Sequence, residues 1–317
     1  MSAPSELLVT LARGYVRKAP GTLLKGAVAA RYLSPRLRDH PRQRVVDARF
    51  DAMSGAGPGA GSAARFAVDT QDLIQRYIYM YGVWEPHLMR WLASRLRAGD
   101  VLVDVGANIG FLSVYGSRLV GATGRVVAIE ASPAFHRRVL QHAGINGCDN
   151  IRAVNAAVSD SRRTLTFVLA SSRNMGANSI VPWDGPAEST FETEARPLPE
   201  LLQPDEIARA RVIKIDVEGA EGGVVRGLAP MLDELRPDAE IAVEVTPGRM
   251  ERLGDSVEEL LETMREHGFH TYRLANDYAP RSYPGALRRP EPPVRWRGPV
   301  TAESDLVFSR VDAETLI

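Results

Sequence analysis

The chain has little cysteine, no excess of charge of either sign and no long apolar run. Its single cysteine, Cys148, excludes a disulfide framework and a cysteine-rich zinc site. The 39 basic and 39 acidic side chains cancel, so no overall field favours binding to nucleic acid. No stretch approaches the roughly 20 apolar residues that a membrane span needs. We therefore expect a globular protein, and the scarcity of cysteine together with the absence of a signal-peptide pattern predicts the cytoplasm.

The zero net charge hides an uneven distribution. Residues 1–50 contain ten Lys or Arg and three Asp or Glu, so this segment carries +7 and the remainder −7. The segment is either a loosely packed basic arm or a surface that contacts an anionic membrane or an acidic partner. Pro20, Pro35 and Pro41 interrupt any long helix here, which favours the first interpretation.

Hydrophobic spacing predicts the order of the elements. Residues 45–50 and 65–68 are expected to form a hairpin around the glycine-rich loop 55–62, followed by helices at 72–81 and 87–96. From residue 101 onward, strands and helices alternate. The expected strands are 101–105, 125–129, 151–157, 211–216 and 240–245, and the expected helices are 110–120, 133–145, 219–233 and 256–267. This rhythm predicts an α/β fold with a Rossmann-like, doubly wound and mostly parallel sheet that has helices on both faces.

Two segments depart from the rhythm. Residues 164–199 lack helical spacing and are predicted to form an inserted hairpin near the carboxyl ends of the strands. Residues 269–274 and 305–310 are expected to pair antiparallel at the sheet edge, with an irregular loop over 280–300 between them. The predicted organisation is an N-terminal helix and hairpin extension over residues 1–68, which includes the basic arm, and one domain over residues 69–317.

The turn after the first core strand predicts a cofactor site. It reads Asp104-Val-Gly-Ala-Asn-Ile-Gly110 and leads into an amphipathic helix. Gly106 and Gly110 have no side chains to block a ligand, and Asp104 and Asn108 add polarity beside the backbone. The Gly-x-Gly-x-x-Gly spacing of dinucleotide sites and the Gly-Lys-Ser/Thr end of a P-loop are both absent. A carboxylate in this turn would repel phosphate and suits a cofactor with a cationic amino group.

Glu130, at the end of the second core strand, narrows the choice of cofactor. In doubly wound folds an acid at this place accepts hydrogen bonds from ribose hydroxyls. Together with Asp104 it predicts a nucleoside that carries an amino acid, namely S-adenosylmethionine. Ser132 and Pro133 are explained as the N-cap and first residue of the next helix, but capping does not explain Glu130.

Several stretches resemble the FkbM family of S-adenosylmethionine-dependent methyltransferases. They are Val103–Gly110, Ala128–Pro133, Asn155–Asp160, Ile213–Glu221 and, upstream, Gly82–Pro86. The resemblance implies a class I methyltransferase fold and methyl transfer to a hydroxyl of a sugar, glycolipid or polyketide (macrolide) natural product. The residues that it and the turn pattern place at the cofactor are Glu85, Asp104, Gly106, Asn108, Gly110, Glu130, Ser132, Ala157 and Asp216.

The fourth core strand carries the best candidates for catalysis. An alcohol is a weak nucleophile, so a base or a cation is expected beside it. Lys214 and Asp216 alternate onto one face of the strand. Lys214 either serves the acceptor site, directly or by orienting a carboxylate, or forms a buried ion pair with an acid on a neighbouring strand. Glu218, which the resemblance moves towards the active site, and Glu244 at the end of the fifth strand are candidate general bases, whereas Glu221 is predicted to be a structural acid at a helix start.

Other polar residues leave alternatives open. Asn174, Asn178 and Ser179 are predicted to bind the acceptor, although turn chemistry explains them too. Carboxylates at adjacent strand ends can hold Mg²⁺, but Glu244 is followed by Val-Thr-Pro rather than by an Asp and Asn pair, so we predict no metal. Glu85 is either a cofactor contact or a first-turn helix acid, and His142 is expected to face solvent. Alternative functions are a non-catalytic binding protein with this fold and a nucleotide-dependent oxidoreductase.

Overall fold

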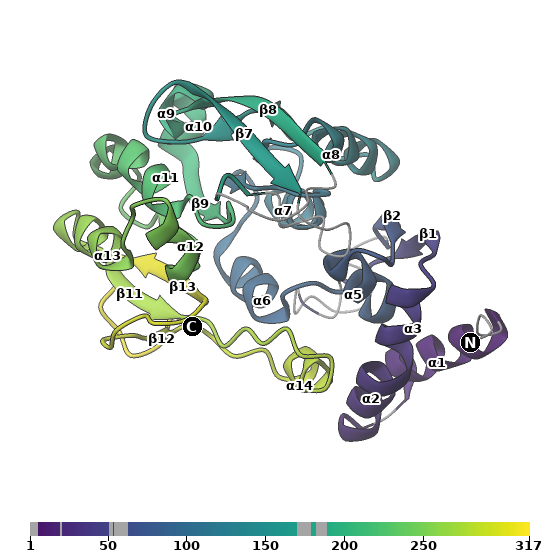
Figure 1. The fold of residues 1–317 in the computed structure, drawn as a ribbon. Coiled ribbons are helices and arrows are strands. Elements are labelled where there is room, and N and C mark those ends of the chain that lie inside the picture. The colour runs from purple at the N-terminus through teal and green to yellow at the C-terminus, as the bar shows by residue number, and fades with distance from the viewer. Residues whose placement is uncertain (1–5, 20, 51–52, 54–62, 170–178, 182–188) are drawn as a thin grey trace. The chain divides into compact units, whose positions relative to one another are not determined.

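A computed structural model describes residues 6–19, 21–50, 53, 63–169, 179–181 and 189–317 (Figure 1). The chain divides into two compact units. The described residues of the first unit are those up to Arg90 together with Ala275–Glu291, and the remaining described residues form the second. Helix α6 (Pro86–Arg95) begins in the first unit and ends in the second. Within the described part of the chain, no helix combines the length and apolarity needed to cross a membrane.

The first unit begins with a series of short helices. They are α1 (Glu6–Lys18), α2 (Leu23–Val28), a π-helical turn (Ala29–Leu33) and α3 (Ser34–Asp39). Pro35 does not interrupt them as expected, because α2, the π-helical turn and α3 follow one another without a break and the residues at both junctions have helical backbone. Val9, Leu33 and Leu37 are buried. Residues 6–19 and 21–39 therefore form packed helices, and the expectation of a loosely packed arm is wrong because α1, the π-helical turn and α3 bury apolar side chains.

A hairpin and a capped helix follow. Strands β1 (Gln43–Asp47) and β2 (Arg65–Asp69) pair antiparallel, which confirms the predicted pairing, while the loop 55–62 lies outside the described residues. Helix α5 (Leu73–Tyr81) starts where the Asp72 carboxylate accepts a hydrogen bond from the Gln75 amide at 2.9 Å.

The segment predicted to be an irregular loop over 280–300 contains helix α14 (Tyr283–Arg288) and the two-residue strand β12 (Val294–Arg295). Helix α14 belongs to the first unit, where the Tyr283 ring lies 4.8 Å from Tyr77 and 4.7 Å from Tyr81, measured between ring centroids. This aromatic cluster orders a segment whose own sequence has no helical periodicity, and it explains why the prediction of a loop is wrong.

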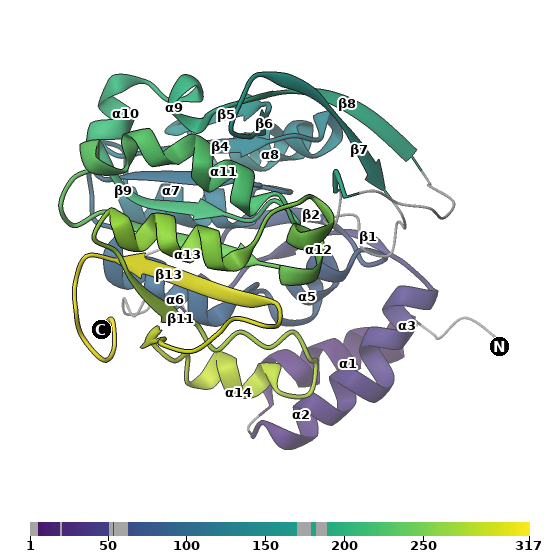
Figure 2. The ribbon, with the colours of Figure 1, turned by 60° about the vertical axis from the view of Figure 1, so that its left-hand side comes forward.

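The second unit is built on an eight-stranded sheet in the order β12-β11-β13-β10-β9-β3-β4-β5 (Figure 2). Its other strands are β3 (Val101–Val105), β4 (Arg125–Glu130), β5 (Ile151–Asn155), β9 (Ala210–Ile215), β10 (Glu240–Val245), β11 (His270–Arg273) and β13 (Ser304–Ser309). Five neighbouring strands are parallel, namely β10, β9, β3, β4 and β5. Strand β13 pairs antiparallel with both β10 and β11. The predicted doubly wound sheet is confirmed, with the antiparallel strands at one side.

Helices cover both faces of this sheet (Figure 2). They are α7 (Phe111–Val120), α8 (Pro133–Ile145), α9 (Leu198–Leu201), α10 (Pro204–Arg209), α11 (Glu221–Leu228), α12 (Pro247–Arg252) and α13 (Val257–Glu266). The helix expected over 219–233 is shorter, because Pro230 lacks the amide hydrogen that would continue it and a 3-10 helix (Ala229–Glu234) follows.

Alternation along the strands decides which side chains face which helices. Val103, Ile213 and Val243 join α11 and α13 in one apolar core. Leu102 faces α7 instead. Its side chain lies against Gly116 of that helix, where a methyl group on the glycine would overlap it. Even-numbered residues of β3 and β9 therefore point to the α7 side.

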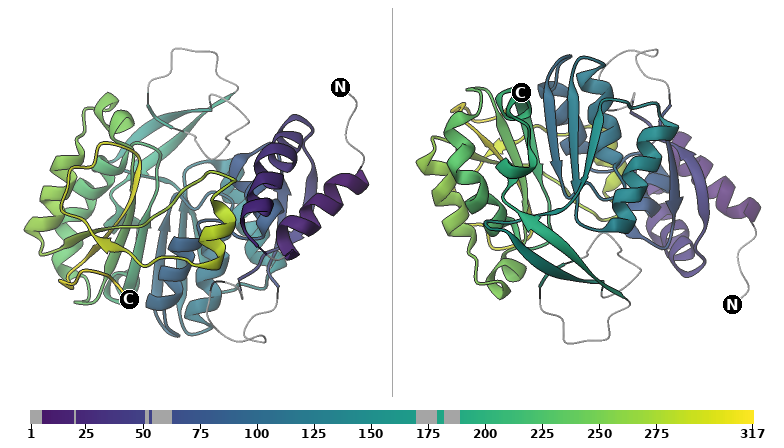
Figure 3. Two further views of the ribbon diagram at one scale, coloured as in Figure 1. Left: turned by 90° about the horizontal axis from the view of Figure 1, so that it is seen from below. Right: turned by 90° about the horizontal axis from the view of Figure 1, so that it is seen from above.

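A second, three-stranded sheet contains β6 (Ala157–Val158), β8 (Ser189–Arg196) and β7 (Arg163–Leu169), in that order. The strand expected over 151–157 is thus divided between two sheets at Ala156. Strands β7 and β8 form the predicted inserted hairpin, which extends outward from the larger sheet (Figure 3).

Candidate functional site

The turn after β3 is fixed by its own backbone. The amides of Gly106 and Ala107 both donate to the carbonyl of Ile129 at the end of β4, at 2.9 and 3.0 Å. Gly106 and Gly110 have φ values of 78°, and Asn108 has a φ of 53°. Left-handed backbone at a residue other than glycine is uncommon and is concentrated at functional sites.

The two glycines are required for a reason that differs from the expected one. A Cβ on Gly106 would overlap the carbonyl oxygen of Asp216, and a Cβ on Gly110 would lie 3.3 Å from the Cα of Val139 in α8. The missing side chains let the turn pack against the end of β9 and against α8. The structure therefore explains both glycines by packing, whereas the sequence interpretation explained them by ligand approach.

Glu130 joins the turn to the start of α8. One carboxylate oxygen accepts a hydrogen bond from the Asn108 amide at 2.7 Å, and the other accepts one from the Ser132 amide at 2.8 Å. Burial raises the pKa of Glu130 to about 7, although these two amides act in the opposite direction. Each carboxylate oxygen retains a second acceptor position, so this acid can still receive two hydroxyl donors.

Two further predicted residues, Ser132 and Ala157, follow the ends of β4 and β5. The Ser132 hydroxyl accepts a hydrogen bond from the Phe135 amide at 3.4 Å and caps α8, as expected. Asn155, at the end of β5, donates to the carbonyls of Glu130 and Ala131 at 2.9 and 3.0 Å. Ala157 is buried two residues further on, where β6 begins.

Asp104 lies beneath the turn rather than on its surface. Its side chain is only 1% exposed, and one carboxylate oxygen accepts a hydrogen bond from the Ser113 hydroxyl of α7 at 2.5 Å. The other oxygen lies 3.6 Å from the Lys214 ammonium. The negative charge is therefore compensated inside the sheet.

Lys214 is the centre of this buried group. Its ammonium donates to the Gly106 carbonyl at 3.0 Å and to the Asp216 carboxylate at 3.1 Å. Lys214 therefore has features of both open interpretations. It pairs with Asp104 on the neighbouring strand, and it also orients the carboxylate of Asp216. Asp216 is the more exposed partner, with 24% of its side chain accessible against 1% for Asp104.

Glu218 follows in the turn after β9. Its φ is 60°, its carboxylate forms an ion pair with Arg249 of α12, and its carbonyl accepts a hydrogen bond from the Ser179 hydroxyl at 2.7 Å. The predicted acceptor residue Ser179 therefore contacts the predicted base Glu218. Glu221 is fully buried and accepts hydrogen bonds from the amides of Gly219 at 2.9 Å and Val217 at 3.3 Å, as a structural acid does.

Glu244 lies on the same face of the sheet as Lys214. Ala242 of β10 is the register partner of Lys214, so alternation places Glu244 beside the end of β9. Across the other edge of β10 its register partner is Asp305. Both side chains are half-buried.

The three remaining predicted residues belong to the first unit or lie outside the described residues. Glu85 belongs to the first unit, has a φ of 48° and accepts a hydrogen bond from the Tyr278 hydroxyl at 3.2 Å. Asn174 and Asn178 lie outside the described residues.

Sequence reasoning missed several members of the site. Ser113 lies in the first turn of α7, and its spacing from the Asp104 turn was a usable signal. Arg249 had none, because it comes from a different helix that follows β10. The prediction for His142 is wrong, since its ring is buried and its Nδ1 lies 2.6 Å from the Ile109 carbonyl, where it supports the turn.

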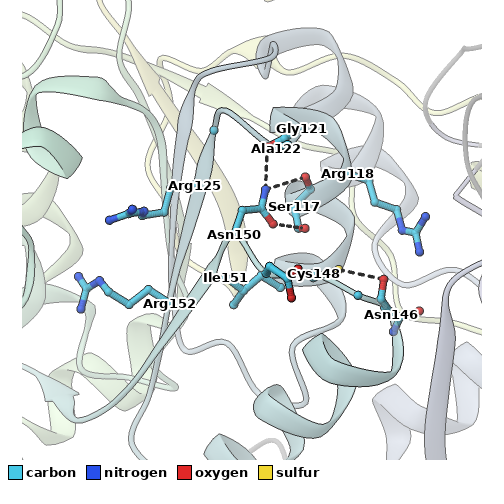
Figure 4. Close-up of a pocket in the computed structure, with 13 residues that line it drawn as sticks. Ser117, Arg118, Gly121, Ala122, Arg125, Asn146, Cys148, Asn150, Ile151 and Arg152 are labelled. Atoms are coloured by element: carbon cyan, nitrogen blue, oxygen red, sulfur yellow. Dashed lines mark hydrogen bonds between the residues drawn. The ribbon is translucent and has the colours of Figure 1, made fainter.

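A separate hollow of about 630 Å³ lies in the second unit near the amino ends of β4 and β5 (Figure 4). Its central Asn150 is bonded to the carbonyls of Ser117 and Gly121, at 3.1 and 2.8 Å. Arg125 and Arg152 point away from Arg118 in Figure 4. Ligands of doubly wound sheets bind at the carboxyl ends of the strands, so this hollow is not the cofactor site.

The chain is similar to several known proteins. The hexuronic acid methyltransferase AglP of Haloferax volcanii is 25% identical over 222 residues, which cover 69% of this chain and 88% of that protein. A methyltransferase FkbM structure from Methylobacillus flagellatus KT is 15% identical, with a TM-score of 0.37 over 82% of this chain and 57% of that one. The fibrillarin of Aeropyrum pernix with natively bound S-adenosyl-L-methionine is 13% identical, with a TM-score of 0.34 over 67% and 66% of the two chains.

The description of the matching family is "Methyltransferase FkbM domain", and the match runs from residue 104 to residue 271. It begins at Asp104 and includes Glu130, Lys214 and Glu244. This match covers more than half of the chain, and the sheet has the doubly wound order expected of a class I methyltransferase. The chain therefore belongs to the FkbM family of S-adenosylmethionine-dependent methyltransferases.

Proposed function

We propose that the enzyme methylates a hydroxyl oxygen of a sugar, a glycolipid or a polyketide natural product. The observation that carries this proposal is the group of acids at adjacent strand ends, Asp216, Glu218 and Glu244, beside the buried Lys214. S-adenosylmethionine supplies an electrophilic methyl group, so the protein's task is to orient an acceptor and to take its proton. Carboxylates suit a hydroxyl acceptor, and the relative named for hexuronic acid supports a sugar.

The donor set fits the cofactor. Glu130 offers two acceptor positions to the ribose hydroxyls, and its orientation is fixed by the amides of Asn108 and Ser132. We assign Asp216 to the methionine part of the cofactor or to the acceptor, and Ala157 stays a predicted cofactor contact. Asp104 acts indirectly, because its buried carboxylate holds Lys214, which in turn holds the Gly106 carbonyl of the turn. Glu85, as a further cofactor contact, stays a prediction.

Two acids are candidates for the base, and their surroundings differ. Arg249 forms an ion pair with Glu218, which fixes the orientation of that carboxylate. Glu244 is half-buried beside the end of β9 and opposite Asp305. We therefore assign proton removal to Glu244 and acceptor positioning to Glu218, with Ser179 and the inserted hairpin. Lys214, held by two carboxylates, serves as a positioning residue rather than as the base.

The test is methyl transfer from labelled cofactor to a panel of uronic acids, lipid-linked sugars and macrolides, with the methylated atom identified by mass spectrometry and NMR. Glu244→Gln is expected to lower kcat by roughly 10²- to 10⁴-fold with KM for the cofactor unchanged. Glu266→Gln, an exposed acid on α13, is the matched control. Methylation at nitrogen or carbon, or full turnover by Glu218→Gln and Glu244→Gln alike, would overturn the assignment.

Cofactor binding is tested separately by calorimetry. Glu130→Ala and Asp104→Ala are both expected to weaken binding, the first through lost ribose contacts and the second through the collapse of the turn. The same titration with NAD should give no heat of binding. Unchanged affinity for S-adenosylmethionine in both variants would remove the site from this turn.

The remaining proposals concern the surroundings of the enzyme. We propose a cytoplasmic protein that acts on a small molecule and does not bind nucleic acid. A glycolipid acceptor would bring it to a membrane surface, and residues 1–50 carry the positive charge that an anionic surface attracts.

A further inference from the structure

The first unit contains a cavity whose charged lining is entirely positive. Its volume is about 470 Å³, and it is lined by α1, α2, Tyr81 and α14 together with Arg49. The charged residues of the lining are Arg17, Lys18, Lys25, Arg49 and Arg288, and no acid belongs to the described lining. Several of these residues come from helices that are far apart in sequence. The fold therefore brings the positive charges together, which no single basic stretch of the sequence does.

The cations are crowded and partly desolvated. The Arg17 guanidinium donates to the Asp47 carbonyl at 2.8 Å, and Arg49 donates to the Arg17 carbonyl at 3.2 Å. Burial, followed by repulsion from Arg13 and Arg49, lowers the pKa of Arg17 to about 10. Burial and Arg49 also lower the pKa of Lys25. An anion in this cavity would relieve the repulsion between these groups.

Exposed leucines lie on the two helices that line the cavity. On α1, Leu7, Leu8 and Leu11 are 67%, 52% and 60% exposed, and on α2, Leu23 and Leu24 are 86% and 63% exposed. Large apolar side chains are rarely left this accessible in neighbouring positions of a soluble protein.

The leucine stripe of α1 is a second apolar face. Val9 and Val16 are buried on the opposite side of the helix and attach it to the first unit. Leu7, Leu11 and Lys18 follow helical spacing and share the outer side. The outer leucines are therefore not needed for packing of α1, and they leave an apolar surface next to a basic one.

The leucines of α2 adjoin the cavity in sequence. Leu23 and Leu24 stand between Thr22 and Lys25, both of which line the cavity, and Lys18 ends α1 at its edge. Helices α1 and α2 contact each other and lie alongside in Figure 2. Apolar side chains next to cations match the two layers of a membrane surface, in which acyl chains lie below anionic headgroups.

We propose that α1, α2 and the cationic cavity form a docking surface for an anionic phospholipid membrane, with the leucines in the interfacial layer and a headgroup phosphate in the cavity. This inference deepens the proposed function, because a lipid-linked sugar is the acceptor that a docked enzyme would reach. Membrane binding itself does not depend on which acceptor is methylated. A soluble phosphorylated ligand would explain the cavity but not the leucines.

The experiment is co-sedimentation of the full chain with vesicles of phosphatidylcholine alone or mixed with phosphatidylglycerol. We expect binding to the anionic vesicles only, and weakening as salt is added. Lys25→Glu and Arg288→Glu should each lower the partition coefficient at least about fivefold. Leu23→Ser with Leu24→Ser should lower it further. The controls are Arg137→Glu and Leu140→Ser, exposed residues of α8 in the second unit.

Several outcomes would overturn the proposal. One is equal binding to neutral and anionic vesicles, and another is an equal loss of vesicle binding in the control variants. A third is tight binding of inorganic phosphate by a chain that does not bind vesicles. Cofactor binding and circular dichroism of each variant establish that it is folded. Turnover on a water-soluble acceptor separates the two proposals, because lost vesicle binding with unchanged turnover concerns docking alone. Vesicle binding by a chain that methylates no hydroxyl would leave docking intact and remove the proposed acceptor.

Discussion

The ammonium group of Lys214 donates a hydrogen bond to the backbone carbonyl of Gly106, 3.0 Å away. The only lysine of the second unit thus holds the turn that carries the cofactor residues. The same ammonium compensates the buried Asp104 and orients the more exposed Asp216. Its contribution to catalysis is therefore expected to pass through the position of the turn.

Removing this cation should destabilise the fold. Lys214→Met leaves Asp104 buried without its positive partner, and we expect a loss of roughly 3–5 kcal/mol in the free energy of unfolding. Lys214→Met combined with Asp104→Asn should recover part of that loss. Urea denaturation of the single and double variants measures the coupling. Strictly additive losses would show that the pair does not interact.

The turn glycine is expected to tolerate no side chain. Gly106→Ala combines a left-handed φ with overlap against the Asp216 carbonyl, and it should cost more than about 2 kcal/mol. Gly144→Ala on α8 is the matched control, since nothing lies within 4 Å of its added methyl group and its backbone is helical. That variant should gain up to about 1 kcal/mol. Similar stabilities of the two variants would contradict the packing explanation of Gly106.

Stability should depend on the protonation of Glu221. Burial raises its pKa from 4.5 to about 7, so the folded chain binds this proton more tightly than the unfolded chain does. The contribution of this proton to the free energy of unfolding is on the order of 3 kcal/mol. It is complete below a pH of 4.5, the pKa of the unfolded chain, and is lost as the pH rises through about 7. Glu221→Gln should flatten this part of the pH profile of unfolding, and Glu266→Gln should not. An unchanged slope in Glu221→Gln would refute the raised pKa.

Methyl transfer should not require a divalent metal. Glu244 is followed by Val-Thr-Pro, which supplies no further carboxylate or amide ligand after β10. We expect the same turnover with and without EDTA, measured as S-adenosylhomocysteine released. Loss of turnover with EDTA that Mg²⁺ restores would instead assign the strand-end acids to a metal.

The sequence predicted the elements whose limits are set locally. Strands β3 and β10 and helix α8 have the predicted bounds, because short buried runs and the Ser132-Pro133 cap define them within a few residues. Helix α14 was not predicted, because its structure depends on a distant contact. The hydroxyl of Tyr283 donates a hydrogen bond to the carbonyl of Val83, 200 residues earlier.

The same distinction holds for the site. Glu130 and Asp104 were located by their places at strand ends, which periodicity defines. The burial of Asp104 was not predictable, since it depends on Ser113 and Lys214 approaching from two other elements. Arg249 likewise reaches Glu218 from α12, and no local pattern announces that pairing.

The bond between Lys214 and Gly106 joins residues separated by 108 positions. A growing chain that has emerged only through β4 contains the turn and Glu130 but not the ammonium that holds the turn in place. Contacts this distant in sequence form slowly, because a long loop must close before they are gained. The turn should therefore acquire its final shape late in folding, after β9 has inserted beside β3, and cofactor binding during refolding would report that last step.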